Sequence, residues 1–161
     1  MDIIKDWKTI KKHISDSFKS SLHVSIATVN KNNVPSVTPI GTLFLNNNQT
    51  GFYFEKFSSG LTSNVEKNNK VCVLAVNSNA FFWMKSLFHG QFKKLPALKL
   101  YGELGLKRKA TAAEKHALSR RMRFTKSLKG NRYLWNDMQF VREIHFNEVE
   151  SMKLGKMIPS Y

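Results

Sequence analysis

The stretch from Gly51 to Asn77 constrains the fold more than any other, because it joins two strand-like segments through a short connection. Phe52-Tyr-Phe54 is short and aromatic, which is typical of a β-strand. Val71 to Val76 is a β-branched, apolar run of strand length, and we expect both of its faces to be buried or nearly so. The connection is a hydroxyl- and glycine-rich turn followed by one or two turns of polar helix.

This turn has the composition of an anion-binding site. Ser58, Ser59 and Thr62 can each cap the helix that follows, and Gly60 lies among them. The free amides of a helix start and the helix dipole both favour negative charge, so a phosphate group would fit there. The alternative is that the hydroxyl groups only cap the helix, and the residues by themselves leave both interpretations open.

Strands also dominate the rest of the pattern. We expect strands at residues 22–30, 36–45, 97–106, 140–146 and 149–154, and helices at residues 2–20, 79–90 and 111–129. In chain order the first three strands are residues 22–30, 36–45 and 52–54, and tight turns join them. This predicts an antiparallel meander, to which Val71–Val76 adds a fourth strand. Pro39 predicts an edge or bulge position, and Gly102 predicts a bulge or a close approach. The fold class is therefore mainly β (α+β), with six or seven antiparallel strands in a small barrel and peripheral helices.

Composition bounds the class of protein. With 161 residues and 42% hydrophobic content, the chain is expected to form a single domain, residues 1–161, with a substantial core. The lone cysteine, Cys72, excludes an intramolecular disulfide and suits a reducing cytoplasm. No run approaches the ~20 apolar residues of a membrane span, and no export signal is evident. We therefore expect a cytoplasmic protein without a membrane partner, whose amphipathic helix at 2–20 packs on the domain rather than on a membrane surface.

The charge distribution suggests a second class of partner. The formal net charge of +15 attracts polyanions and phosphorylated ligands without specificity. Residues 107–132 hold ten Lys or Arg and one acid, so much of the excess lies on the predicted basic helix. With Phe124, Tyr133 and Trp135 as stacking groups, this region would be a nucleic-acid or polyanion site. The alternative, which we favour, is a solvated basic face.

The predicted helix at 79–90 has more apolar surface than one face can bury. Its large apolar side chains are Phe81, Phe82, Trp83, Leu87 and Phe88. Such an excess indicates a partner subunit or a flat ligand, and we favour a dimer contact.

An ordered set of segments between His23 and Asn77 carries a family resemblance. The segments are His23-Val-Ser-Ile-Ala-Thr28, Val34-Pro-Ser-Val37, Thr38-Pro-Ile40, Gly51-Phe-Tyr-Phe54, Ser59, Asn64, Asn68 and Val71-Cys-Val-Leu74. In this order they resemble the FMN-binding split-barrel family typified by pyridoxamine 5'-phosphate oxidase. The resemblance implies a six-stranded split barrel, a homodimer, and two flavin sites at the subunit interface.

The resemblance also implies where FMN would bind. The loop and helix start after Phe54 would hold the phosphate, and the segment Thr38 to Ile40 would border the isoalloxazine. The candidate cofactor-binding residues are Thr38, Pro39, Ile40, Lys56, Ser58, Ser59, Gly60, Thr62 and Asn64. Family members carry a basic residue after the phosphate-contacting Ser, whereas this chain has Gly60. The phosphate would then need another cation, such as Lys56, Arg108 or a basic residue of the partner subunit. This departure leaves deazaflavin and haem open as alternative cofactors.

Motifs of other reaction classes are weak. We find no paired carboxylates at catalytic spacing, no P-loop, and no metal-ligand spacing among the five histidines, so no metal site is expected. Flavin chemistry needs none of these, because the cofactor carries the hydride. The resemblance implies a flavin-dependent oxidoreductase acting on a small molecule, with unknown catalytic residues and with Tyr53, Phe81 and Trp83 as walls of the substrate site. In a haem protein, His89 or His145 would be the ligand.

Overall fold

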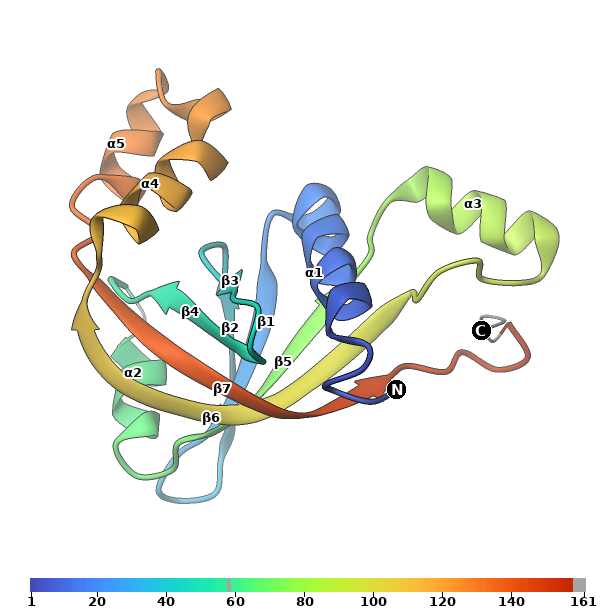
Figure 1. Cartoon of the computed structure of the whole chain (residues 1–161), viewed down its shortest axis with the longest axis horizontal. Coiled ribbons are helices and arrows are strands. Elements are labelled where there is room, and N and C mark those ends of the chain that lie inside the picture. Colours follow the sequence, from blue (N-terminus) through green and yellow to red (C-terminus); the bar gives the residue numbers. More distant parts are fainter. Residues whose placement is uncertain (58, 158–161) are drawn as a thin grey trace.

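The computed structural model describes residues 1–57 and 59–157, and within them seven strands form one antiparallel sheet (Figure 1). The strands are β1 (Val24–Val29), β2 (Pro35–Ile40), β3 (Phe44–Leu45), β4 (Thr50–Phe54), β5 (Lys70–Val76), β6 (Ala97–Lys109) and β7 (Phe140–Ser151). The helices are α1 (Trp7–Ser21), α2 (Ser59–Val65), α3 (Ala80–His89), α4 (Ala112–Arg121) and α5 (Lys129–Trp135), with a short 3₁₀ helix η1 (Arg123–Thr125). The strand order is β2-β1-β5-β6-β7-β4-β3.

The two long strands β6 and β7 curve across the molecule and join its two halves (Figure 1). On one side β5 pairs with β6 and continues to β1 and β2, and on the other side β4 pairs with β7 and carries β3. This arrangement confirms the predicted fold class, a split-barrel-like sheet with peripheral helices. Pro39 lies on β2, at an edge of the sheet, as its missing amide donor predicts.

Helix α1 closes the main core. Its apolar face buries Trp7, Ile10 and Ile14 among strand residues that are themselves fully buried, such as Ile26 and Leu100. This confirms that the predicted N-terminal helix packs on the domain. Burial of a side chain of this size contributes about 1.5–3 kcal/mol, so the face is a major part of the folding free energy.

Helix α1 begins later than predicted. The Asp2 carboxylate accepts the backbone N–H groups of Ile4 and Lys5 at 2.9 and 2.8 Å and holds them in a turn before the helix. Ile4, within the range predicted to be helical, is 70% exposed as a result.

The predicted meander is wrong at its second strand, residues 36–45, which was expected to run without a break. Residues 36–45 form two strands, β2 and β3, separated by a break at Gly41 to Leu43. Thr42 occupies that break, and its hydroxyl accepts the N–H of Phe54 at 3.2 Å and donates to the Phe54 carbonyl at 3.3 Å. Strand β4 therefore pairs with β3 and β7 instead of continuing from β2.

Two predicted C-terminal strands are one. Strand β7 runs without a break, and a register shift opposite Tyr101 and Gly102 leaves Asn147 as an additional residue. The bulge explains why Phe146 and Val149, three positions apart, are both buried. Gly102 is required there, because a Cβ would lie 2.3 Å from the His145 carbonyl oxygen. The predicted close approach at Gly102 is confirmed.

The long basic helix predicted at 111–129 is also wrong. Its start is confirmed, since Thr111 and Glu114 form a capping box, but α4 ends at Arg121. Gly130, the residue directly after the predicted end, lies inside α5. Leu118 is the only buried residue of α4, so little apolar packing holds a longer helix together. Four cations within two turns, Arg120, Arg121, Arg123 and Lys126, also repel one another.

Helix α3 has the predicted bounds, with Asn79 as N-cap and Gly90 in the left-handed conformation as its stop. It projects from the end of the molecule opposite α4 and α5 (Figure 1). Phe81, Met84, Leu87 and Phe88 are all more than 60% exposed, which agrees with the predicted excess of apolar surface. Among the helices that the structure describes, none has the length and apolar character needed to cross a membrane.

Strand β5 is less buried than predicted. Val71, Val73 and Ala75 are buried, but the alternate residues Cys72, Leu74 and Val76 are only half-buried. Burial of Cys72 raises the pKa of its thiol, which disfavours the reactive thiolate form.

Candidate functional site

The candidate site lies where β4 ends and the predicted anion-binding turn begins. Glu55 is the first residue after β4, and its carboxylate is buried. Arg142 on β7 binds both carboxylate oxygens, from Nε at 3.0 Å and from Nη2 at 3.1 Å. Thr62 donates its hydroxyl to Glu55 at 2.7 Å, and the Lys107 ammonium lies 3.6 Å away.

The partners of Glu55 keep it ionised. Burial by itself would raise the pKa of the Glu55 carboxyl, but the hydrogen bonds from Arg142 and Thr62, with the charges of Arg142 and Lys107, outweigh it and lower the pKa. The nearby Tyr53 hydroxyl has a raised pKa, because it is buried and faces the Glu55 charge. The Glu55 carboxylate thus faces two cations, Arg142 and Lys107, so this group has a net positive charge.

A hollow of about 370 Å³ opens beside this group. Its wall includes the cations Lys56 and Lys107, the acids Glu55 and Glu66, and Thr62. Because Arg142 already neutralises Glu55, the two lysines outnumber the remaining acid. The residues present therefore fit an anionic group such as a phosphate, held mainly by side-chain charge.

Helix α2 contributes less to this site than the sequence indicates. It spans only seven residues, so few peptide dipoles align along it. Apart from its chain neighbours and the helix backbone, no atom of the described residues lies within 4 Å of where a Cβ of Gly60 would be, which leaves room for a ligand. Ser58 lies outside the described residues, and of Ser59 only the backbone is described, as the first residue of α2.

The other predicted phosphate residues have partners within the chain. The Lys56 ammonium donates to the Asn136 carbonyl at 2.6 Å, and the Thr62 hydroxyl donates to Glu55. The Asn64 amide is buried and donates to the Thr28 hydroxyl at 3.0 Å, which fixes α2 on β1. Asn64 therefore acts on the site through the position of α2.

The predicted isoalloxazine segment ends beside the same turn. Thr38 is half-buried, Pro39 is exposed and Ile40 is buried, all on the edge strand β2. Helix α2 packs on β2, and Thr42 bonds the end of β4 directly before Glu55. The fold thus brings the two halves of the predicted site together, although they are well separated in sequence.

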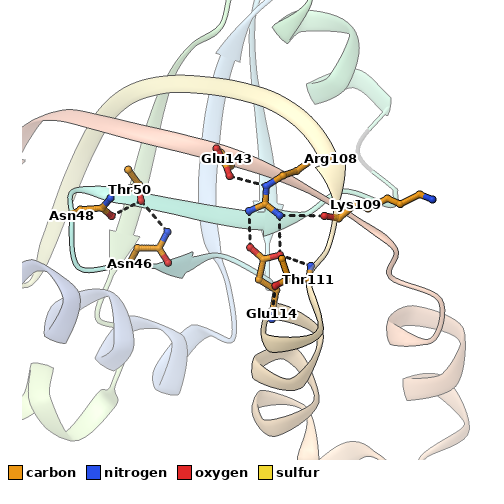
Figure 2. Close-up of polar contacts among 8 residues, drawn as sticks. All are labelled: Asn46, Asn48, Thr50, Arg108, Lys109, Thr111, Glu114 and Glu143. Carbon is orange, nitrogen blue, oxygen red and sulfur yellow. Dashed lines mark hydrogen bonds and ion pairs between the residues drawn. The ribbon is translucent and has the colours of Figure 1, made fainter.

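Arg108, predicted as a substitute cation, is engaged elsewhere. Its Nε donates to Glu143 at 2.7 Å, and its Nη1 and Nη2 bind both Glu114 oxygens at 2.9 and 2.7 Å (Figure 2). Hydrogen bonds from Arg108 hold the pKa of Glu114 below its usual range. The prediction for Arg108 is wrong because Glu114 fixes the start of α4 and draws the guanidinium to itself. Lys107, its neighbour in sequence, faces the site instead.

The predicted substrate walls do not converge within one chain. Tyr53 is fully buried in the main core, so it cannot contact a substrate. Phe81 and Trp83 lie on α3, far from α2 (Figure 1), and Trp83 donates its indole N–H to the Asn77 carbonyl at 2.6 Å. Tyr53 is therefore corrected from a site residue to a core residue.

Sequence reasoning missed Glu55, Lys107 and Arg142. The available signal was a charged residue directly after an aromatic strand, together with the charged pair Arg142 and Glu143 between the apolar residues Val141 and Ile144. Charges at such positions indicate a buried pair.

The histidines are dispersed in the structure as well. His89 and His145 are exposed, on α3 and β7 respectively, while His13 is buried. Burial lowers the pKa of His13, although its contact with the Ala75 carbonyl opposes the shift. In the described residues, no group of three or more His, Cys, Asp or Glu side chains could hold a metal ion.

The match to known families covers most of the chain. Residues 10–150 match the family model described as pyridoxamine 5'-phosphate oxidase. The chain belongs to the pyridoxamine 5'-phosphate oxidase family. This confirms the resemblance noted from the short segments, and it includes the basic region and the C-terminal strand, which those segments do not cover. No curated protein matches the chain.

Solved structures show the same fold at low identity. An FMN-binding protein from Syntrophomonas wolfei is 12% identical, with a TM-score of 0.64 over 94% of this chain and 90% of that one. An F420 reductase is 12% identical, with a TM-score of 0.57 over 86% and 96%. HutZ, the haem storage protein of Vibrio cholerae, is 14% identical, with a TM-score of 0.55 over 94% and 95%. This chain is thus similar in fold to proteins named for three different cofactors.

Proposed function

We propose that this protein is a homodimeric, cytoplasmic FMN-binding flavoprotein that acts as an oxidoreductase on a small molecule. The observation that carries the proposal is the hollow at Glu55 to Thr62, which lies where the family resemblance puts the FMN phosphate. Bound FMN supplies hydride transfer, and the chain's part is to position the cofactor and set the charge around it.

The phosphate contacts fall to a small set of residues. Lys56 and Lys107 carry the positive charge, and the amides and hydroxyls of Ser58, Ser59 and Gly60 carry the hydrogen bonds, while Thr62 lines the hollow and holds Glu55 in place. Asn64 fixes α2, and Thr38, Pro39 and Ile40 border the ring system. Lys107 thus replaces the basic residue that family members place after the Ser.

The homodimer is supported by surfaces that one chain leaves open. Strand β2 is an edge, and Val37 on it is 64% exposed. The outward face of β5 is only half-covered. Exposed apolar surface of this kind, together with the side chains of α3, is typical of a subunit interface.

The proposal is tested by titrating purified protein with FMN and recording the visible spectrum and flavin fluorescence. Wild type takes up one FMN per chain. Lys107→Met weakens binding by about tenfold, because a charge-assisted contact is lost. Lys109→Met, the same change two positions along β6 and outside the hollow, is the matched control and leaves binding unchanged. Colourless protein that takes up no FMN contradicts the proposal.

Two other cofactors are tested in the same assay. The deazaflavin F420 carries a flavin-like ring and an anionic tail, so its preferential uptake would make the protein a deazaflavin enzyme. The haem iron would need a protein ligand, and His89 and His145 are exposed, so either could supply it. A Soret band that is lost in His89→Ala or His145→Ala would identify haem as the cofactor.

Polyanion binding is a second candidate function. Phe124 and Tyr133 are 81% and 79% exposed beside exposed cations such as Arg123 and Arg132, which is the composition of a stacking surface. Trp135, the third predicted stacking group, is half-buried. A gel shift of RNA or DNA at near-physiological ionic strength would support this function, and its absence would leave a solvated basic face.

A further inference from the structure

A large groove lies on the other side of the molecule from α2, bounded by α1, the segment from Gly41 to Leu45, and α4 with the residues after it. Its volume is about 840 Å³, within the roughly 300–1,000 Å³ of small-molecule sites. Most of its wall is apolar, including Ile14, Phe44 and Trp135. We call it the α1–α4 groove.

The α1–α4 groove has a single sign of charge. Four cations line it, Lys11, Lys19, Arg120 and Arg121, and no acid does so among the described residues. Lys11 and Lys19 have polar partners, Asn47 and Asp16. The groove therefore combines a mainly apolar wall with positive charge.

Arg121 is the unusual residue of this groove. Its guanidinium carbon lies 3.6 Å from the centre of the Phe44 ring and 4.4 Å from that of Phe18, so two aromatic rings hold it. Nη1 donates to the carbonyls of Gly41 at 3.2 Å and Leu43 at 2.7 Å. No carboxylate in the described residues pairs with it.

The bonds of Nη1 leave Nε and Nη2 without an acceptor in the described part of the chain. These two nitrogens form one edge of the guanidinium, and such an edge takes a carboxylate with two parallel hydrogen bonds. Burial lowers the pKa of the Arg121 guanidinium to about 10, so it keeps its charge at neutral pH but lacks the solvation of a surface arginine. An anion at this edge would replace that solvation.

We propose that the α1–α4 groove binds an amphiphilic carboxylate, with its acidic head on Arg121 and its apolar body along the aromatic and aliphatic wall. The ligand class follows from the groove: one fork-shaped cation selects a carboxylate, and the apolar remainder selects a hydrocarbon or aromatic body. This site is separate from the proposed FMN site, and its test does not depend on FMN binding.

The test uses decanoate as the probe, below the concentration at which it forms micelles. Binding is measured by calorimetry and by tryptophan fluorescence, to which Trp135 in the groove contributes. Wild type binds one decanoate per chain, and 1-decanol and decylamine bind at least about tenfold more weakly because they lack the anionic head. Arg121→Met weakens decanoate binding by about tenfold or more, whereas Arg123→Met, the same change on the exposed η1, leaves it unchanged.

A second pair of variants removes the dependence on Arg121, whose loss can disturb the Gly41–Leu43 segment. Ala117→Trp fills the groove one turn before Arg121 and is expected to abolish binding. Ala113→Trp, one turn earlier on an exposed position outside the groove, binds like wild type. The proposal is overturned if wild type does not bind decanoate, if decanol binds equally well, if Ala117→Trp binds normally, or if FMN displaces the probe.

Discussion

Arg142 is buried and Arg121 is half-buried, and the chain stabilises these two charged side chains in different ways. Arg142 is paired through two hydrogen bonds with the buried Glu55, so its charge is neutralised inside the chain. Arg121 is held by aromatic rings and two carbonyl groups, and no carboxylate of the described chain meets it. The contrast teaches that burial of a cation does not by itself indicate a ligand site, because the charge of Arg142 is already satisfied inside the chain.

The largest expected effect is the loss of Arg142. Arg142→Met leaves the Glu55 carboxylate buried without its main partner, and we expect a loss of about 3–5 kcal/mol in the free energy of unfolding. Urea denaturation measures it. The double variant Glu55→Gln/Arg142→Met recovers much of the loss, because the uncompensated charge is gone. A loss below about 1 kcal/mol in the single variant would show that the pair is not structural.

Arg121→Met has a smaller effect on folding. It removes no partner of a buried carboxylate, but it leaves two backbone carbonyls without a donor and removes the contacts with the Phe18 and Phe44 rings, which together cost about 1–2 kcal/mol. Thermal or urea unfolding of Arg121→Met and Arg142→Met under the same conditions shows which variant loses more unfolding free energy. Equal losses in both variants would mean that Arg121 is as structural as Arg142, which would erase the contrast between them.

The pH dependence of stability tests the Glu55–Arg142 ion pair separately. The folded-state pKa of Glu55 is below the ordinary value of 4.5, so its contribution to stability is complete above about pH 4.5 and is lost as pH falls through the lowered pKa. The stability gap between wild type and Glu55→Gln should be constant from pH 7 to 5 and close below 4.5. Denaturant titrations at several pH values measure the gap. A gap that grew on acidification would contradict the assigned ion pair.

Lys107 is expected to matter least for stability. Its side chain is 42% exposed and its ammonium lies 3.6 Å from Glu55, so Lys107→Met should change the unfolding free energy by at most about 0.5 kcal/mol. Differential scanning calorimetry against Lys109→Met as control measures this. A loss above 2 kcal/mol would indicate that Glu55 needs both cations to fold.

The sequence predicted those features of the fold that depend on interactions between residues close together in the chain. Alternation predicted β6, and the capping box at Thr111 predicted the start of α4, because both depend on neighbours within a few residues. The end of α4 and the break at Gly41 to Leu43 could not be predicted, since they depend on contacts with distant elements. Arg121 itself bridges these two places.

The cofactor-binding residues stay a prediction, and of the charged residues at the candidate site only Lys56 was among them. The segments at Thr38 to Ile40 and at the turn after Glu55 could be paired only through the family resemblance, and the fold brings them together. Lys107 faces the turn and its neighbour Arg108 does not. This difference depends on strand register and on the position of Glu114, and the spacing of residues in the sequence predicts neither. The identity of the bound cofactor stays a prediction.

The pairing of β4 with β7 also has a consequence for how the chain is made. Thr50 meets His145, so the aromatic strand β4 emerges from the ribosome long before its main neighbour exists. Until then its open backbone edge, with Phe52 and Phe54 beside it, is a template for wrong association. Such late, long-range closure slows folding, so synthesis of the last quarter of the chain decides whether the barrel forms or aggregates.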